Sequence, residues 1–248
     1  MTPTVDIDEL VVDYRRSRAL AGLSLELGLG VHGLVGPNGA GKTTLIRVLA
    51  TVLRPSAGRV HVLGREITDR DRRTEVRRRL GYLPQTLGYF PGFTVREFVE
   101  YVAWLKEVPP RRVPTAVDDA LEQVGLQERA GSRMRTLSGG MLRRAGVAQA
   151  IVNQPELLLL DEPTAGLDPE QRVGFRVLLR QLGRTSTVLV STHLVEDVAS
   201  ACTGVALLDA GRVVFTGTPA DLATAGTHGD GDTPSERGYL ALLHGARR

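Results

Sequence analysis

This sequence of 248 residues contains one cysteine, Cys202, and two lysines, Lys42 and Lys106, among its 31 basic residues. One cysteine excludes an internal disulfide and suits a reducing compartment. The formal net charge is only +3, which is too small to indicate a nucleic-acid partner, so none is expected. Because almost all of the other basic residues are arginines, Lys42 indicates a site that needs a compact ammonium group.

Long apolar runs are also missing. No segment approaches the ~18–20 apolar residues that crossing a bilayer requires, and the first residues lack the apolar core of a signal peptide. We therefore expect a cytoplasmic protein that does not itself span a membrane. The arginine-rich run at 70–79 is expected to be a solvated surface, with a contact to lipid or to a partner as the alternative.

What the chain does contain is an alternation of strand-like and helix-like segments. Strands are predicted at 5–12, 23–29, 31–35, 59–63, 80–83, 157–161, 187–192, 204–208 and 212–216. Helices are predicted at 41–52, 94–124 with a break at Pro109, 138–153, 169–182, 193–202 and 235–243. This order predicts an α/β fold with a mainly parallel sheet.

The same segments suggest a domain organisation. We expect one main domain over 1–225, with an α/β core, an N-terminal antiparallel β region and a helical subdomain inserted at about 87–155. Residues 226–248 are expected to form a loop rich in glycine and aspartate, followed by a short C-terminal helix.

The segment 36–44 carries the strongest local signal. It follows a short apolar strand, opens a helix, and matches the complete phosphate-binding loop pattern, with the residues Gly36, Pro37, Asn38, Gly39, Ala40, Gly41, Lys42, Thr43 and Thr44. Glycines allow backbone N–H groups to turn toward phosphates, and the helix N-terminus adds roughly half a positive charge. We predict ATP bound here, with Lys42 on its β- and γ-phosphates, Thr43 on Mg²⁺ and Thr44 toward the α-phosphate.

Two carboxylates, Asp161 and Glu162, end the apolar run at 157–160. Ligands of open α/β sheets bind at the carboxyl ends of strands, where the phosphate loop also lies. Asp161 is predicted to hold Mg²⁺, and Glu162 to orient and polarise the attacking water. The alternative is that this pair only caps the turn at 163–166.

With these motifs in place, the chain resembles the ATP-binding cassette (ABC) family over about residues 5–225. The resemblance implies that the domain at 1–225 is an ABC ATPase domain with a P-loop NTPase core. The segment Leu137-Ser138-Gly139-Gly140-Met141 is similar to the family's signature motif, and Ser138, Gly139 and Gly140 are implied to bind the γ-phosphate of ATP held by a second subunit. The alternative is an N-capped helix with nothing bound. Met141 stands where the family usually has glutamine. The pattern Gly-Gly-Met-x-Arg-Arg resembles export-type, ABC-2-like cassettes.

Four further residues match family motifs in the expected order. Gln85 is implied to link Mg²⁺ and water to the helical subdomain, and His193 to sense the γ-phosphate. Asp168 ends the segment 165–168, which resembles the family's loop that crosses the dimer. The same residue also suits a helix N-cap. Tyr14 resembles the aromatic residue that stacks on adenine; the alternative is an ordinary residue at a strand end.

The resemblance implies an ATPase subunit that works as a dimer, with a homodimer expected. A separate transmembrane permease subunit would hold it at the inner face of the cell membrane. The resemblance favours export as the direction of transport. One alternative is a soluble cassette ATPase that acts on nucleic acid or ribosomes. A second is a regulator that binds ATP without hydrolysis, which the presence of Glu162 and His193 disfavours.

Overall fold

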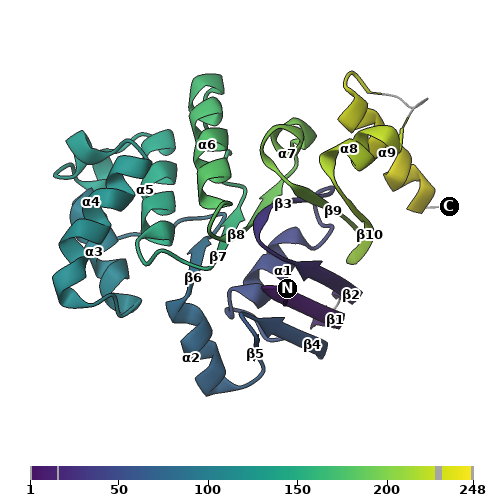
Figure 1. Cartoon of the computed structure of the whole chain (residues 1–248), viewed down its shortest axis with the longest axis horizontal. Helices are drawn as coiled ribbons and strands as arrows, with labels where there is room; N and C mark the ends of the chain where they lie inside the picture. The colour runs from purple at the N-terminus through teal and green to yellow at the C-terminus, as the bar shows by residue number, and fades with distance from the viewer. Residues whose placement is uncertain (1, 16, 227–230, 247–248) are drawn as a thin grey trace.

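Two sheets form the centre of the molecule (Figure 1). The computed structural model describes residues 2–15, 17–226 and 231–246. In that part of the chain the first sheet is antiparallel, in the order β2-β1-β4-β5. Its strands are β1 (Val5–Tyr14), β2 (Ser17–Leu27), β4 (Ala57–Val62) and β5 (Arg65–Glu66).

The second sheet is mainly parallel and follows the order β10-β9-β3-β8-β7-β6. Its strands are β3 (Gly30–Val35), β6 (Leu80–Leu83), β7 (Leu157–Asp161), β8 (Thr187–Thr192), β9 (Gly204–Asp209) and β10 (Arg212–Gly217). Only β10 pairs antiparallel, at one edge. The predicted α/β class with a mainly parallel sheet is therefore confirmed. Because β3, β8, β7 and β6 run parallel, their carboxyl ends lie at the same end of the sheet.

Helix α1 (Lys42–Leu49) packs between the two sheets. Its apolar side chains Leu45, Ile46, Val48 and Leu49 are fully buried. They join one core cluster with leucines and valines from β1, β2, β4, β7 and β9. Burial of a leucine or isoleucine side chain contributes about 1.5–3 kcal/mol, so the start of α1, where the phosphate loop ends, is anchored on both sides.

Three helices between β6 and β7 make the lobe on the left of Figure 1. They are α3 (Val95–Leu105), α4 (Val113–Gln123) and α5 (Gly139–Ile151). A capping box of Thr94 and Glu97 begins α3, and the helices share a buried cluster that includes Phe98, Val117 and Met134. The boundary proposed for the helical subdomain, about 87–155, encloses all three.

Two helices occur where none was predicted. Helix α2 (Arg70–Arg78) covers the arginine-rich run and is capped by Asp69, whose side chain accepts a hydrogen bond from the Asp71 backbone N–H. Helix α8 (Pro219–Thr224) begins with a capping box of Thr218 and Asp221. Neither segment shows a strong apolar period, so the sequence signal for both helices lies in their caps.

The remaining helices follow the prediction in outline. They are α6 (Pro169–Leu182), α7 (Val195–Ala201) and α9 (Pro234–Ala246), the last longer than expected. Residues 227–230 of the predicted C-terminal loop lie outside the described residues. Across the described ranges, no helix is both long enough and apolar enough to cross a membrane.

Candidate active site

The phosphate loop connects β3 to α1 and can be built only with glycine at two key positions. A side chain at Gly36 would run into the carbonyl oxygen of Leu208. At Gly41 the φ angle is 107°, and a Cβ atom would lie 2.7 Å from the carbonyl oxygen of Ala19. These glycines let the loop pass close to β2 and β9 and leave its backbone N–H groups available for an anion.

Lys42, the first residue of α1, lies across this loop. Its side chain is only 6% exposed, and Nζ donates hydrogen bonds to the carbonyl oxygens of Gly36 at 2.6 Å and Pro37 at 3.0 Å. Burial lowers the pKa of the ammonium group, while Glu162 and Asp161 act to raise that pKa. The loop therefore holds a buried cation against its own backbone carbonyl groups.

Asp161, at the end of β7, is the most deeply buried acid of the site, at 1% exposure. Its Oδ1 atom accepts hydrogen bonds from Ser191 Oγ at 2.6 Å and Thr43 Oγ1 at 3.3 Å. Its Oδ2 atom is buried and has no hydrogen-bond partner among the residues that the structure describes. A buried carboxylate oxygen without a partner is costly unless a cation compensates it.

This donor set fits Mg²⁺. Mg²⁺ binds oxygen ligands and usually takes only one or two carboxylates, with phosphates and water completing its shell. The carboxylate of Asp161 and the hydroxyl of Thr43 supply two such oxygens beside the phosphate loop. Within the described ranges no group of three or more His, Cys, Asp or Glu side chains could hold a metal ion.

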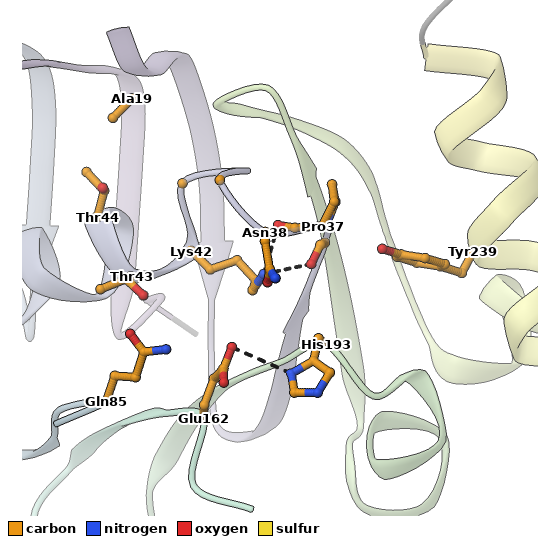
Figure 2. A pocket seen from close by; sticks show the side chains of 13 residues that line it. Ala19, Pro37, Asn38, Lys42, Thr43, Thr44, Gln85, Glu162, His193 and Tyr239 are labelled. Atoms are coloured by element: carbon orange, nitrogen blue, oxygen red, sulfur yellow. Dashed lines mark hydrogen bonds and ion pairs between the residues drawn. The ribbon is translucent and has the colours of Figure 1, made fainter. Parts of the chain in front are cut away.

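Glu162 and His193 face each other from adjacent segments (Figure 2). Oε1 of Glu162 lies 3.6 Å from Nδ1 of His193, and the two side chains are 17% and 54% exposed. The backbone of Glu162 has a φ angle of 49°, uncommon for a residue other than glycine. Its N–H donates to Ser191 Oγ at 2.9 Å, which holds this turn on β8.

A cavity of about 610 Å³ brings most of the predicted site residues together. It is lined by the P-loop, by Gln85 after β6, by Glu162 after β7 and by His193 after β8. The carboxyl ends of three neighbouring strands thus face the loop that follows β3. The arrangement provides an anion-binding loop, a candidate metal site and a carboxylate that can accept a proton.

Other predicted residues lie outside this cavity lining. Ala40 and Asp161 are buried and do not line it. Tyr14 ends β1 and is 43% exposed, paired with Ser17 across the hairpin. Ser138 caps α5 by accepting from the Met141 N–H at 3.3 Å, and Gly139 and Gly140 follow it. Asp168 caps α6 by accepting from the Gln171 N–H at 2.8 Å.

The structure adds residues that the sequence did not point to. Ser191 connects Asp161 to the Glu162 turn, and its place before Thr192 and His193 at a strand end was an available signal. Ala19 of β2 and Tyr239 of α9 line the cavity, and Figure 2 shows Tyr239 directed toward the loop. No sequence pattern identifies Tyr239, because its approach depends on how α9 packs against α7 and α8.

Asp161→Asn provides a direct test of the metal site. The amide can still accept from Ser191, but it lacks the charge that holds Mg²⁺. We expect Mg²⁺ to stop strengthening ATP binding, a loss of roughly tenfold or more in affinity if one charged contact is worth about 1.5–3 kcal/mol. Titration calorimetry with Mg²⁺ or with EDTA measures this difference, and an unchanged Mg²⁺ dependence would exclude Asp161 from the site.

Comparison with known proteins agrees with this geometry. The family model described as "ABC transporter" matches residues 20–165. The daunorubicin resistance ATP-binding protein DrrA3 of Streptomyces coeruleorubidus is 40% identical over 228 residues, which are 91% of this chain and 71% of that protein. The Nod factor export ATP-binding protein I of Ralstonia nicotianae is 35% identical over 98% of this chain and 77% of that protein.

Solved structures show the same fold. The cbiO1 protein of Clostridium perfringens, described as part of the ABC transporter complex cbiONQ, superposes with a TM-score of 0.81 at 28% identity, over 90% of this chain and 92% of that one. The ATP-binding subunit of another ABC transporter superposes with a TM-score of 0.85 at 24% identity, over 97% and 99% of the two chains. That second likeness concerns the fold alone.

The family match spans the phosphate loop, Asp161 and Glu162, and the matches to the relatives cover nearly the whole chain. ATP and Mg²⁺ are the cofactors of this family, and the residues around the cavity fit both. The chain is an ATPase that belongs to the ABC transporter family.

Proposed function

We propose that this chain is the ATP-hydrolysing subunit of a membrane exporter and powers transport through a separate transmembrane permease. The observation that carries the proposal is that the phosphate loop, Gln85, Glu162 and His193 all line one cavity. Relatives named for drug resistance and for Nod factor export support the direction of transport. In this proposal the chain is cytoplasmic and lies at the inner face of the cell membrane.

In the proposed reaction, Lys42 and the backbone N–H groups of the loop bind the phosphates. Thr43 and Asp161 would hold Mg²⁺, which when bound would supply positive charge beside the phosphates. Glu162 orients the attacking water and accepts its proton as the water oxygen bonds to the γ-phosphorus. The bond between the γ-phosphorus and the oxygen that bridges it to the β-phosphate breaks, and ADP and phosphate leave. His193 contacts the γ-phosphate from beside Glu162, and Gln85 connects the site to the helical lobe.

We further propose that the site is completed by a second copy of the chain. Ser138 and Gly139 are exposed at the start of α5 and lie outside the cavity of their own subunit. A helix N-terminus of this kind suits an anion brought to it from a partner. Gly140 packs against the side chain of Gln171, just after Asp168, so the signature segment and the segment that precedes α6 would meet the partner together. Tyr14 is the candidate for stacking on adenine.

An exposed aromatic cluster supports the docking of a permease. Phe90, Phe93, Tyr101 and Trp104 contact one another with ring centroids 4.9–6.2 Å apart, and Trp104 remains 68% exposed. Exposed aromatic patches commonly mark protein interfaces. Because the cluster follows Gln85 in the chain, a permease segment bound here could move Gln85.

Purification of the tagged chain from detergent-solubilised membranes of its source organism tests the proposal. We expect a protein with several membrane-spanning segments to co-purify. Trp104→Ala should lower its recovery several-fold while basal ATPase activity stays within about twofold, since a buried interface tryptophan is often worth 2 kcal/mol or more. Leu29→Ala, at another exposed apolar residue, is the matched control.

Two results would contradict the proposal. One is the recovery of the chain without any membrane protein. The other is ATPase activity that is stimulated by RNA and suppressed by added salt, which would favour the soluble cassette ATPase acting on nucleic acid or ribosomes.

A further inference from the structure

Arg143 of α5 is a buried cation whose hydrogen bonds all go to main-chain carbonyl groups. The residue is 8% exposed. Nη1 donates to the carbonyl oxygens of Pro84 and Gln85, both at 3.0 Å. Nη2 donates to those of Asp161 and Glu162, and Nε donates to that of Pro163 at 3.4 Å.

These five carbonyl groups belong to two separate segments of the site. Pro84 and Gln85 follow β6, whereas residues 161–163 follow its neighbour β7. The parallel pairing of β6 and β7 ends at Leu83 and Leu160, so ladder hydrogen bonds no longer hold the two segments together beyond that point. The guanidinium group of Arg143 bridges them where the ladder stops.

The chemistry of the side chain suits this bridge. A guanidinium group has five N–H donors in a rigid planar fork, whereas an ammonium group has three donors at a single point. Burial lowers the pKa of Arg143, and the charges of Asp161 and Glu162 act to raise that pKa. A buried charge without an ion-pair partner is expensive unless its hydrogen bonds are complete, and here the carbonyl groups complete them.

We propose that Arg143 is a positioning residue for hydrolysis: it sets the placement of Gln85 relative to Glu162 and ties both to α5, the helix that Ser138 caps. The inference rests on the proposed roles of Gln85 and Glu162. Since Arg143 lies on the same helix as the signature segment, a shift of α5 on dimer closure would move the Gln85 and Glu162 segments with it.

The next residue, Arg144, provides a matched control. Its Nη1 atom also donates to two main-chain carbonyl oxygens, those of Val124 and Gly125, at 3.3 and 3.2 Å. Both acceptors follow α4 in the helical lobe and line no part of the nucleotide cavity. The two arginines therefore share a helix and a type of contact, and they differ in the segments that they hold.

The test compares Arg143→Lys with Arg144→Lys in the full chain, by steady-state ATPase kinetics and thermal unfolding. We expect Arg143→Lys to lower kcat about 10–100-fold with KM within about twofold, because small misplacements of reacting groups cost up to about 10²-fold. Arg144→Lys should leave kcat within about twofold at a similar change in Tm. Equal loss of kcat in both variants would overturn the proposal.

A double-mutant cycle with Gln85→Ala separates positioning from general weakening. If Arg143 acts through Gln85, Arg143→Lys should reduce kcat much less in the Gln85→Ala background than in the wild-type chain. Full additivity of the two losses would overturn the proposal. Should Arg143→Lys not fold, Arg143→Gln takes its place in the cycle, with a loss of kcat at least as large. A Gln85→Ala variant with undiminished kcat would instead refute the proposed role of Gln85. That result differs from an equal loss of kcat in the Arg143→Lys and Arg144→Lys variants, which would refute the role of Arg143.

Discussion

Glu162→Gln is expected to lower the rate of ATP hydrolysis by at least about 10²-fold, which is the lower end of what a positioned general base contributes, while ATP still binds. The amide has the shape of the carboxylate but cannot accept the proton of the attacking water. Glu162 lines the nucleotide cavity at 17% exposure and faces His193, whereas the phosphate and Mg²⁺ contacts are assigned to other residues. Binding and turnover should therefore separate in this variant.

Phosphate release measures the turnover, and gel filtration with ATP measures dimer formation. The Glu162→Gln variant should accumulate as an ATP-bound dimer, because hydrolysis would no longer remove the γ-phosphate between the subunits. Glu156→Gln is the control, since Glu156 forms a surface ion pair with Arg79 before the start of β7 and should not affect kcat. Turnover within twofold of the wild-type rate would remove Glu162 from its proposed role.

Lys42→Met is expected to weaken ATP binding by about 100-fold or more, the equivalent of one or two charge-assisted hydrogen bonds at about 1.5–3 kcal/mol each. The Lys42 ammonium group is buried and held by the carbonyl oxygens of Gly36 and Pro37, so it is already placed where phosphates would arrive. Methionine fills a similar volume without the charge. Lys42→Arg should restore little binding, because a planar fork does not fit a space built for a compact ammonium.

Calorimetric titration with ATP and Mg²⁺ measures the affinity. The chain provides its own control in Lys106, its other lysine, whose Nζ donates to the carbonyl oxygens of Arg77 and Leu80, away from the cavity. Lys106→Met can alter stability but should leave ATP affinity unchanged. If Lys42→Met binds ATP as tightly as the wild-type chain, the assignment of the phosphate loop is wrong.

Several features of the site could be predicted because they are encoded locally. The phosphate loop is a continuous segment whose glycines, lysine and start of the following helix all lie within nine residues of sequence, 36–44. Asp161 and Glu162 end an apolar run, and parallel strands place such ends at one edge of the sheet. The α/β class followed from the same alternation of strands and helices.

The arginine-rich helix α2 could not be predicted in this way. Its charged residues show no strong apolar period, and its contacts come from distant segments. Arg77 donates to Thr51, and Arg78 pairs with Glu107. Such partners are known only once the chain has folded.

The sequence by itself determined which chemical groups the protein carries and, through local patterns, at which strand end or helix start each one lies. The tertiary structure alone decided which of them meet. Ser191 reaches Asp161 because the register of β7 and β8 places these two residues opposite each other. Arg143 joins the segments after β6 and β7 because helix α5 packs against β6. Long-range pairing and packing set these distances, and no spacing along the chain records them.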